Sequence, residues 1–90
     1  MPKIHLTGTL TCPTDRLDAV RAALPDHIRL TRAEPGCESF EVTETAPGIF
    51  AVSERFTDRA AFDAHQARAA ESPWGQITAG LARAYKISEA

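Results

Sequence analysis

Apolar residues recur at every second position in four separate stretches of this chain, and this spacing is typical of β-strands that bury one face. In the intervals between the first and second stretches and between the third and fourth, apolar residues instead follow the spacing of an amphipathic helix. The predicted order is therefore strand, helix pair, strand, strand, helix pair, strand. It matches the ferredoxin-like split βαβ arrangement, an α+β fold with an antiparallel sheet. The predicted strands cover residues 4–10, 37–43, 49–56 and 82–88.

Prolines mark the predicted ends of the helices. Proline has no backbone N–H and clashes with the preceding turn, so Pro25 is predicted to end the first helix and start the second. Right-handed crossovers place all of the helices on one face of the sheet. The predicted helices cover residues 14–24, 26–34, 59–70 and 73–81.

The chain has 90 residues, which corresponds to one small domain over residues 1–90. Leu, Ile, Val and Phe together number only 18, whereas Ala alone contributes 16. The net charge of −2 is too small to favour disorder, so we expect a folded domain with a thin core. A thin core in a chain of this size favours association with a partner subunit.

The sheet face that points away from the predicted helices supports the same expectation. Its residues are too polar and small for a core, yet too apolar for a face in free solvent. A second copy of the sheet would cover them, so we expect a two-fold homodimer built sheet against sheet. This face consists of His5, Thr7, Thr9, Ser39, Thr43, Ile49, Ala51 and Ser53.

The composition argues against several protein classes. Cys12 and Cys37 form no Cys-x-x-Cys pair and are predicted to lie at opposite ends of the sheet, so we expect two free thiols. The N-terminus lacks the apolar core of a signal peptide, and no stretch approaches the roughly 20 apolar residues of a membrane helix. The ten basic residues are scattered. We therefore expect a cytoplasmic protein that binds neither membranes nor nucleic acid.

No cofactor is expected. The sequence has no nucleotide-binding loop and no metal-ligand spacing, and three His and two distant Cys cannot assemble a ligand set for haem or a transition metal.

Residues 34–42 read Glu-Pro-Gly-Cys-Glu-Ser-Phe-Glu-Val, and residues 53–65 run from a predicted strand into a helix that reaches Asp-Ala-His. Both segments resemble the antibiotic biosynthesis monooxygenase family. The resemblance implies a dimeric α+β barrel that oxidises quinols or polyphenols without metal or flavin. The haem-degrading relatives use an Asn, a Trp and an axial His, where this chain has Leu6, His65 and Gly75. Haem binding of that kind is therefore not expected.

His65 lies at the centre of the apolar stripe of its predicted helix, so its imidazole should point toward the sheet. One interpretation is a core histidine whose ring is satisfied by a backbone carbonyl or by Glu54. The other is a base in an apolar pocket, because an imidazole titrates near neutral pH and can take a phenolic proton. The sequence leaves both interpretations open.

Glu54 is the one acid on the apolar face of its predicted strand, and Arg83, Tyr85 or His65 could partner it. It is either a buried hydrogen-bonding anchor or a catalytic group. Trp74 either caps a pocket or fills the core, and a Tyr85 hydroxyl could orient a substrate oxygen. His27 is predicted to be exposed. The predicted substrate-binding residues are Leu6, Phe40, Phe50, Glu54, Phe56, Trp74 and Tyr85.

Two functional hypotheses follow. The first is a cofactor-independent monooxygenase that oxidises a small aromatic quinol or polyphenol with dioxygen, with His65 as the base. The second is a non-catalytic dimeric module that binds a small molecule or serves in a stress response. A pocket of several hundred cubic ångström that reaches His65 would favour the first hypothesis.

Overall fold

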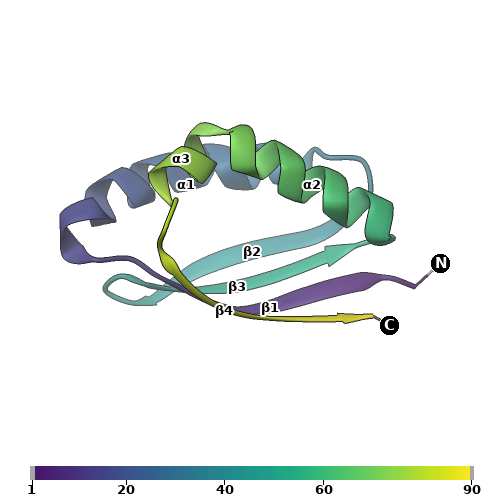
Figure 1. Cartoon of the computed structure of the whole chain (residues 1–90), viewed down its shortest axis with the longest axis horizontal. Coiled ribbons are helices and arrows are strands. Elements are labelled where there is room, and N and C mark those ends of the chain that lie inside the picture. The colour runs from purple at the N-terminus through teal and green to yellow at the C-terminus, as the bar shows by residue number, and fades with distance from the viewer. Residues whose placement is uncertain (1, 90) are drawn as a thin grey trace.

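A computed structural model describes residues 2–89 and confirms the predicted fold class. Four strands form one antiparallel sheet in the order β2-β3-β1-β4, and the helices cover one face of it (Figure 1). The elements in chain order are β1 (Ile4–Thr11), the short 3-10 helix η1 (Thr14–Arg16), α1 (Leu17–Arg32), β2 (Cys37–Ala46), β3 (Ile49–Phe56), α2 (Arg59–Glu71), α3 (Pro73–Ile77) and β4 (Ala82–Glu89).

The even-numbered residues of the central strands face the helices, as their alternation predicts. Ile4, Leu6 and Leu10 of β1 are buried, and they pair in register with Phe56, Glu54 and Phe50 of β3. Glu54 is thus the one charged side chain in an otherwise apolar row. Each phenylalanine ring buried in this way contributes roughly 2–3 kcal/mol of hydrophobic stabilisation.

Two predictions for the helices are wrong. The last helix, α3, ends at Ile77, four residues before the predicted end. Pro25 does not end a helix: α1 continues through it from Leu17 to Arg32 as a single helix. The residues of α1 that face the sheet continue past the proline to His27 and Thr31, both buried. The packing of this uninterrupted stripe offsets the cost of the proline, which is about 3 kcal/mol.

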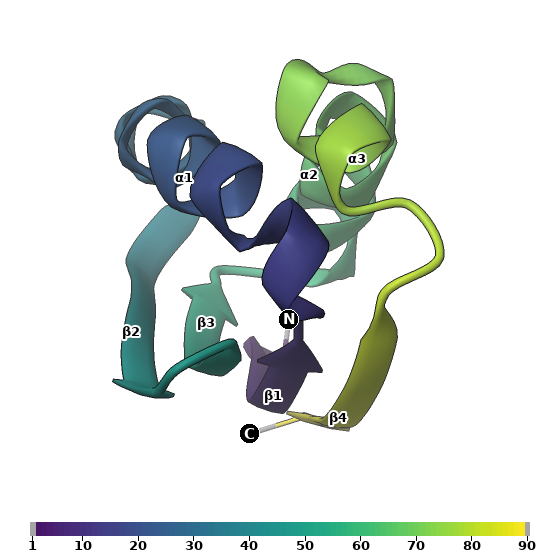
Figure 2. The same ribbon diagram turned by 90° about the vertical axis from the view of Figure 1, so that its left-hand side faces the viewer.

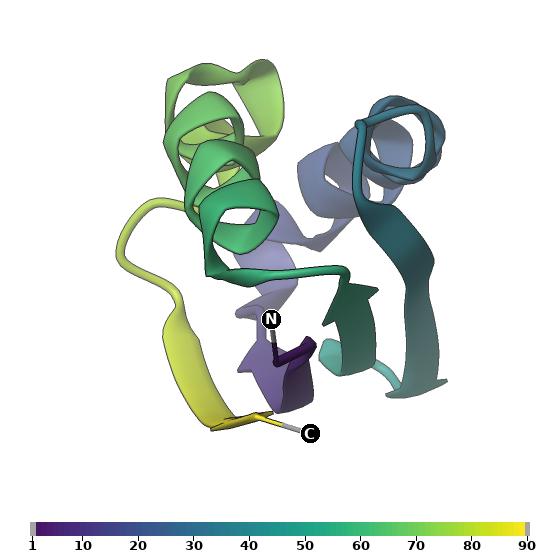
Figure 3. The same cartoon turned by 90° about the vertical axis from the view of Figure 1, so that its right-hand side faces the viewer.

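The helix layer is divided into two parts. Figures 2 and 3 show α1 over the β2 side of the sheet and α2 with α3 over the β1 side. Side chains of α1 and α3 pack against each other between the two parts. Asp58 caps α2, because its carboxylate accepts a hydrogen bond of 2.8 Å from the backbone N–H of Ala61. Ser72 caps α3 in the same way through Gly75.

Gly36 brings the end of α1 close to α2. Its φ of 87° lies in the region that favours glycine, and a Cβ there would lie 2.6 Å from the Cβ of Ala61. The residue is therefore required where the chain leaves α1, passes against α2 and enters β2. This close passage places Glu34 beside α2.

The two cysteines are free, as expected. Cys37 lies at the end of the sheet where it pairs with Phe56, and Cys12 follows Thr11 at the other end, where Thr11 pairs with Ile49. Strand pairing thus holds the two thiols a full strand length apart, beyond the reach of a disulfide. Within residues 2–89, no helix combines the length and the apolar character that a membrane span requires.

Candidate active site

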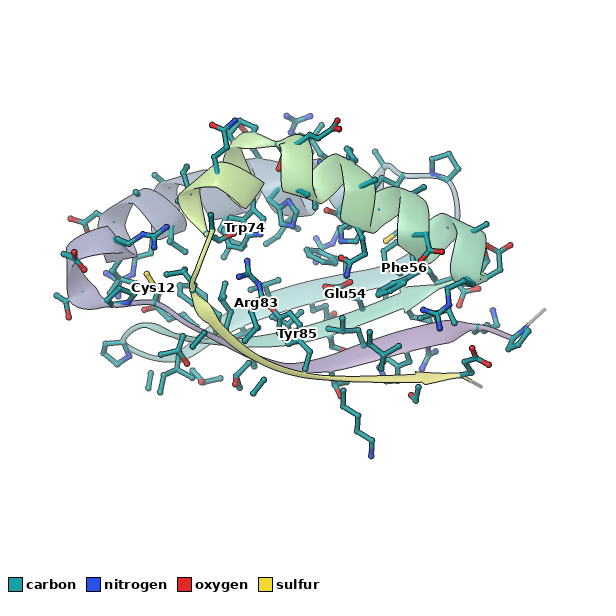
Figure 4. The ribbon with its side chains drawn as sticks, viewed as in Figure 1. Cys12, Glu54, Phe56, Trp74, Arg83 and Tyr85 are labelled. Atoms are coloured by element: carbon teal, nitrogen blue, oxygen red, sulfur yellow. The ribbon has the colours of Figure 1, made fainter. Side chains whose placement is uncertain are left out.

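A cavity of about 340 Å³ lies between the helix layer and the sheet, on the β4 side of the molecule. Figure 4 shows Trp74, Glu54, Arg83 and Tyr85 between the ribbons of the two layers. The lining of the cavity combines two histidines, an acid, an arginine and a tyrosine with small residues of α2 and α3. The cavity is lined by His27, Glu54, His65, Gln66, Ala69, Ala70, Trp74, Gly75, Thr78, Arg83 and Tyr85.

His65 of α2 is 3% exposed and is held by Glu34, which lies just after α1. The distance from His65 Nδ1 to Glu34 Oε1 is 2.7 Å. The second oxygen of Glu34 accepts a hydrogen bond from Nε of Arg68, one turn further along α2. Arg68 also donates to the hydroxyl of Thr31 over 2.9 Å. This network ties α2 to the C-terminal end of α1.

The other side of the His65 ring faces apolar groups and one acid. The ring stacks on Phe56, with a centroid distance of 5.0 Å, and its Nε2 lies 3.7 Å from Oε1 of Glu54. Burial lowers the pKa of His65, although the hydrogen bond that its Nδ1 makes to Glu34 acts in the opposite direction. The imidazole is therefore neutral at pH 7.

Glu54 projects from β3 and is also buried. Burial raises the pKa of its carboxyl to about 7, and the nearby Glu34 carboxylate adds to the shift. Among the described residues no group hydrogen-bonds its Oε1. A buried carboxyl that is half protonated near neutral pH can accept or donate a proton, which a surface glutamate cannot do at that pH.

The prediction that His27 is exposed is wrong. The ring is 5% exposed and stacks on Trp74 of α3, with a centroid distance of 4.7 Å and an interplanar angle of 8°. It is buried because α1 continues past Pro25 and turns this position toward the sheet. Burial lowers the pKa of His27 to about 3, with smaller contributions from His65 and Arg68. Its Nδ1 has no hydrogen-bond partner among the described residues.

β4 contributes Arg83 and Tyr85 to the cavity. The guanidinium of Arg83 donates to the carbonyl of Thr78 over 3.1 Å and to its hydroxyl over 2.9 Å. No carboxylate of the described residues forms an ion pair with it, so its charge can face a ligand. Gly8 of β1 is paired with Tyr85, and a Cβ there would lie 2.8 Å from the tyrosine ring. The absence of a side chain at Gly8 lets that ring lie against β1.

Of the residues predicted from the sequence, His65, Glu54, Trp74 and Tyr85 come together around this cavity. The other predicted residues lie elsewhere in the core. Phe40 and Phe56 contact the His65 ring from outside the lining, and Leu6 packs in the same apolar cluster as Phe56. Phe50 belongs to the cluster at the other end of the sheet.

Sequence reasoning missed His27, Glu34, Arg68, Thr78 and Arg83 as members of the site, although Arg83 was considered as a partner for Glu54. A signal for Glu34 was present, because it opens the Glu-Pro-Gly-Cys segment. Nothing in the sequence indicates its contact with His65, which lies 31 positions away.

A second hollow of about 600 Å³ lies between α1 and β2. It is wider, but its charged groups are largely arginines, and Arg21 there is paired with Glu44 at the surface. The smaller cavity is the candidate active site because it alone of the two contains buried groups that titrate, His65 and Glu54.

Nowhere in residues 2–89 do three or more His, Cys, Asp or Glu side chains gather closely enough to hold a metal ion.

The sequence profile of the antibiotic biosynthesis monooxygenase family matches residues 3–71, which is most of the chain. The chain belongs to this family. The match covers β1 to the end of α2 and therefore includes Glu34, Glu54 and His65 of the cavity. No curated protein matches the sequence significantly.

Solved structures share the fold of this antibiotic biosynthesis monooxygenase domain over nearly its whole length. The Mycobacterium tuberculosis protein Rv0793 is 26% identical with a TM-score of 0.74, and the match covers 96% of this chain and 92% of Rv0793. Shewanella oneidensis SO0527 is 25% identical with a TM-score of 0.78, covering 99% and 91%. A Deinococcus radiodurans protein provisionally named as an antibiotic biosynthesis monooxygenase is 23% identical with a TM-score of 0.75, covering 97% and 91%.

Proposed function

We propose that this protein is a cofactor-independent monooxygenase that oxidises a small aromatic quinol or polyphenol with dioxygen. The observation that carries the proposal is a cavity of about 340 Å³ that reaches a buried, neutral histidine. A volume of this order matches a ligand pocket for a small molecule. Family membership supports the same reaction class.

His65 serves as the base that takes a phenolic proton from the substrate, because a neutral imidazole is the right acceptor near pH 7. Glu54, 3.7 Å from Nε2, exchanges that proton with it. Arg83 and the hydroxyl of Tyr85 stabilise the resulting phenolate, since both line the cavity and the charge of Arg83 has no acidic partner among the described residues. The aromatic surface of Trp74 packs against the ring of the substrate.

The deprotonated quinol then supplies the electrons that a cofactor supplies in other oxygenases. The quinol provides all four electrons that dioxygen accepts. One oxygen atom stays in the hydroxyquinone product, and the other leaves as water. The protein removes the proton from the quinol, orients the resulting anion and excludes bulk water from the cavity in which it reacts.

Oxygen consumption by the purified protein tests this proposal. We expect a panel of hydroquinones and polyphenols to contain at least one compound whose oxidation by dioxygen the protein accelerates above the rate of spontaneous oxidation. The products should contain one atom from labelled dioxygen. A protein that binds members of the panel without accelerating oxygen uptake is instead the binding module that the sequence also allows.

We further propose that the protein is a homodimer formed by the sheet face that no helix covers. In Figures 2 and 3 every helix lies on the other side of the sheet. The open face carries Ile49, which is 40% exposed, among small and hydroxylated side chains. Burying this apolar area against a second copy would stabilise both sheets.

Light scattering at micromolar concentration should therefore give a mass of twice the 9.8 kDa of the single chain. Ile49→Lys should shift that mass toward the monomer, because it places a charge in the apolar part of the interface. Leu30→Lys is a matched control, since Leu30 is similarly exposed but lies on α1. A wild-type mass of 9.8 kDa would exclude the dimer.

A further inference from the structure

We infer that Glu34 is a positioning residue, held by Arg68, which fixes His65 in the tautomer with the proton on Nδ1 and the free electron pair on Nε2. The inference deepens the proposed function and rests on it for the role of His65. The tautomer itself is a property of the folded protein and is measurable without any substrate.

Glu34 is held by Arg68. One of its oxygens accepts a hydrogen bond from Nε of Arg68, and the Glu34 side chain is 15% exposed. A carboxylate paired with a guanidinium in this way is ionised. An ionised carboxylate only accepts hydrogen bonds.

The state of Glu34 determines the tautomer of His65. Because Glu34 can only accept, the contact of 2.7 Å between its Oε1 and Nδ1 of His65 requires the proton on Nδ1. A hydrogen bond made by one ring nitrogen determines which nitrogen of a neutral imidazole carries the proton. In free solution histidine favours the opposite tautomer, so the protein must impose this one.

The nitrogen with the free electron pair, Nε2 of His65, faces Glu54 at 3.7 Å from its Oε1. His65 and Glu54 both line the cavity. Glu34 is not among the residues that line it. The arrangement therefore separates two roles: one acid outside the cavity orients the ring, and the basic nitrogen is directed toward the side where a substrate binds.

The network also anchors the ring in space. Arg68 bonds both Glu34 and the buried Thr31 hydroxyl, so α2 and the end of α1 hold the carboxylate from two sides. The charged or titratable groups around His65 come from every neighbouring element: His27 from α1, Glu34 after it, Glu54 from β3 and Arg68 from α2. Of these, Glu34 alone hydrogen-bonds the ring.

Long-range ¹H–¹⁵N spectra of the ¹⁵N-labelled protein test the inference, because they distinguish a protonated ring nitrogen from one with a free electron pair. The His65 signals are identified by their loss in His65→Gln. In the wild type at pH 7.5 we expect a protonated Nδ1 and a free Nε2. In Glu34→Gln we expect a mixture of tautomers, because an amide can either accept or donate. Glu38→Gln is the matched control, since Glu38 pairs with Lys3 at the surface.

Turnover of a quinol found in the panel gives the second measurement. Glu34→Gln should lower kcat at least roughly 10-fold, because losing a group that orients a histidine costs about 10- to 100-fold at metal sites and up to about 10⁴-fold in a catalytic triad. KM should stay the same because Glu34 does not line the cavity. Arg68→Lys, which keeps the charge but loses the planar fork, should retain the tautomer and lower kcat less.

A wild-type spectrum with the proton on Nε2, or a Glu34→Gln spectrum identical to that of the wild type, would overturn the inference. The wild-type spectrum decides the tautomer even where Glu34→Gln does not fold. A protein that shows the expected tautomers but oxidises no quinol supports the role of Glu34 and counts against the proposed function alone.

Discussion

His65→Ala is expected to lower the turnover of a quinol by roughly 10²-fold or more, which is the usual effect of losing a general base. The physical reason is the loss of the one neutral imidazole nitrogen that faces Glu54 in the cavity. The variant should keep the fold and the association state of the wild type, because Glu34 keeps its ion pair with Arg68 when the imidazole is removed. Steady-state oxygen uptake and light scattering on the same preparation check both parts.

The matched control for this variant is Asp63→Ala, an exposed position on the same helix. Its turnover should equal that of the wild type. If His65 is only a structural residue, its removal should leave turnover unchanged and lower the melting temperature, through a cavity and lost hydrogen bond that cost about 1–3 kcal/mol. Unchanged turnover with a lower melting temperature would refute the catalytic role.

His27 is expected to make the protein sensitive to acid. Its pKa is about 3 in the folded protein and 6.5 in the absence of burial. Between these values the unfolded chain binds a proton that the folded protein does not, so the free energy of unfolding falls as pH falls below 6.5. The slope is about 1.4 kcal/mol per pH unit, which gives a loss of roughly 3 kcal/mol by pH 4.

His27→Phe should remove this dependence. Phenylalanine keeps an aromatic ring against Trp74 and has no nitrogen to protonate or leave unpaired. Glu54 titrates in the same range in both proteins, so its effect cancels in the difference between them. Chemical denaturation at pH 7.5, 6, 5 and 4, at one protein concentration, provides the measurement.

The two proteins should have similar stability at pH 7.5, where His27 is neutral, and should diverge as the pH is lowered. Parallel stability curves from pH 7.5 to 4 would contradict the burial of a neutral imidazole at this position. A divergence of the expected sign would show that His27 is buried and neutral in solution, as it is in the continuous helix α1.

Residue periodicity determined the fold class and which sheet face each strand residue occupies. The two-residue alternation put Leu6, Glu54 and Phe56 on the face that meets the helices, and the structure has all three buried there. The Glu-Pro-Gly-Cys segment and the Asp-Ala-His helix identified the family, which the profile match over residues 3–71 confirms. Local patterns sufficed because strand alternation and turn chemistry depend on near neighbours.

The same local rules misjudged α1. Proline disfavours a helix by about 3 kcal/mol, and sequence alone gave no reason to set that cost aside. The structure offsets it by packing the buried residues of α1 on both sides of Pro25 against the sheet and α3. The exposure of His27 was predicted wrongly for this reason, since a residue at the start of a separate helix would have pointed to solvent.

The sequence by itself placed His65 on a buried helix face and Glu54 in an apolar strand row, because periodicity determines which face a side chain occupies. It did not determine their partners. Glu34 reaches His65 across 31 positions, and Arg68 reaches Thr31 across 37, through a loop whose path depends on how Gly36 packs against α2. Only the tertiary structure decided these contacts, because the partner of a buried polar group depends on the relative placement of two helices, and no spacing within either helix encodes that placement.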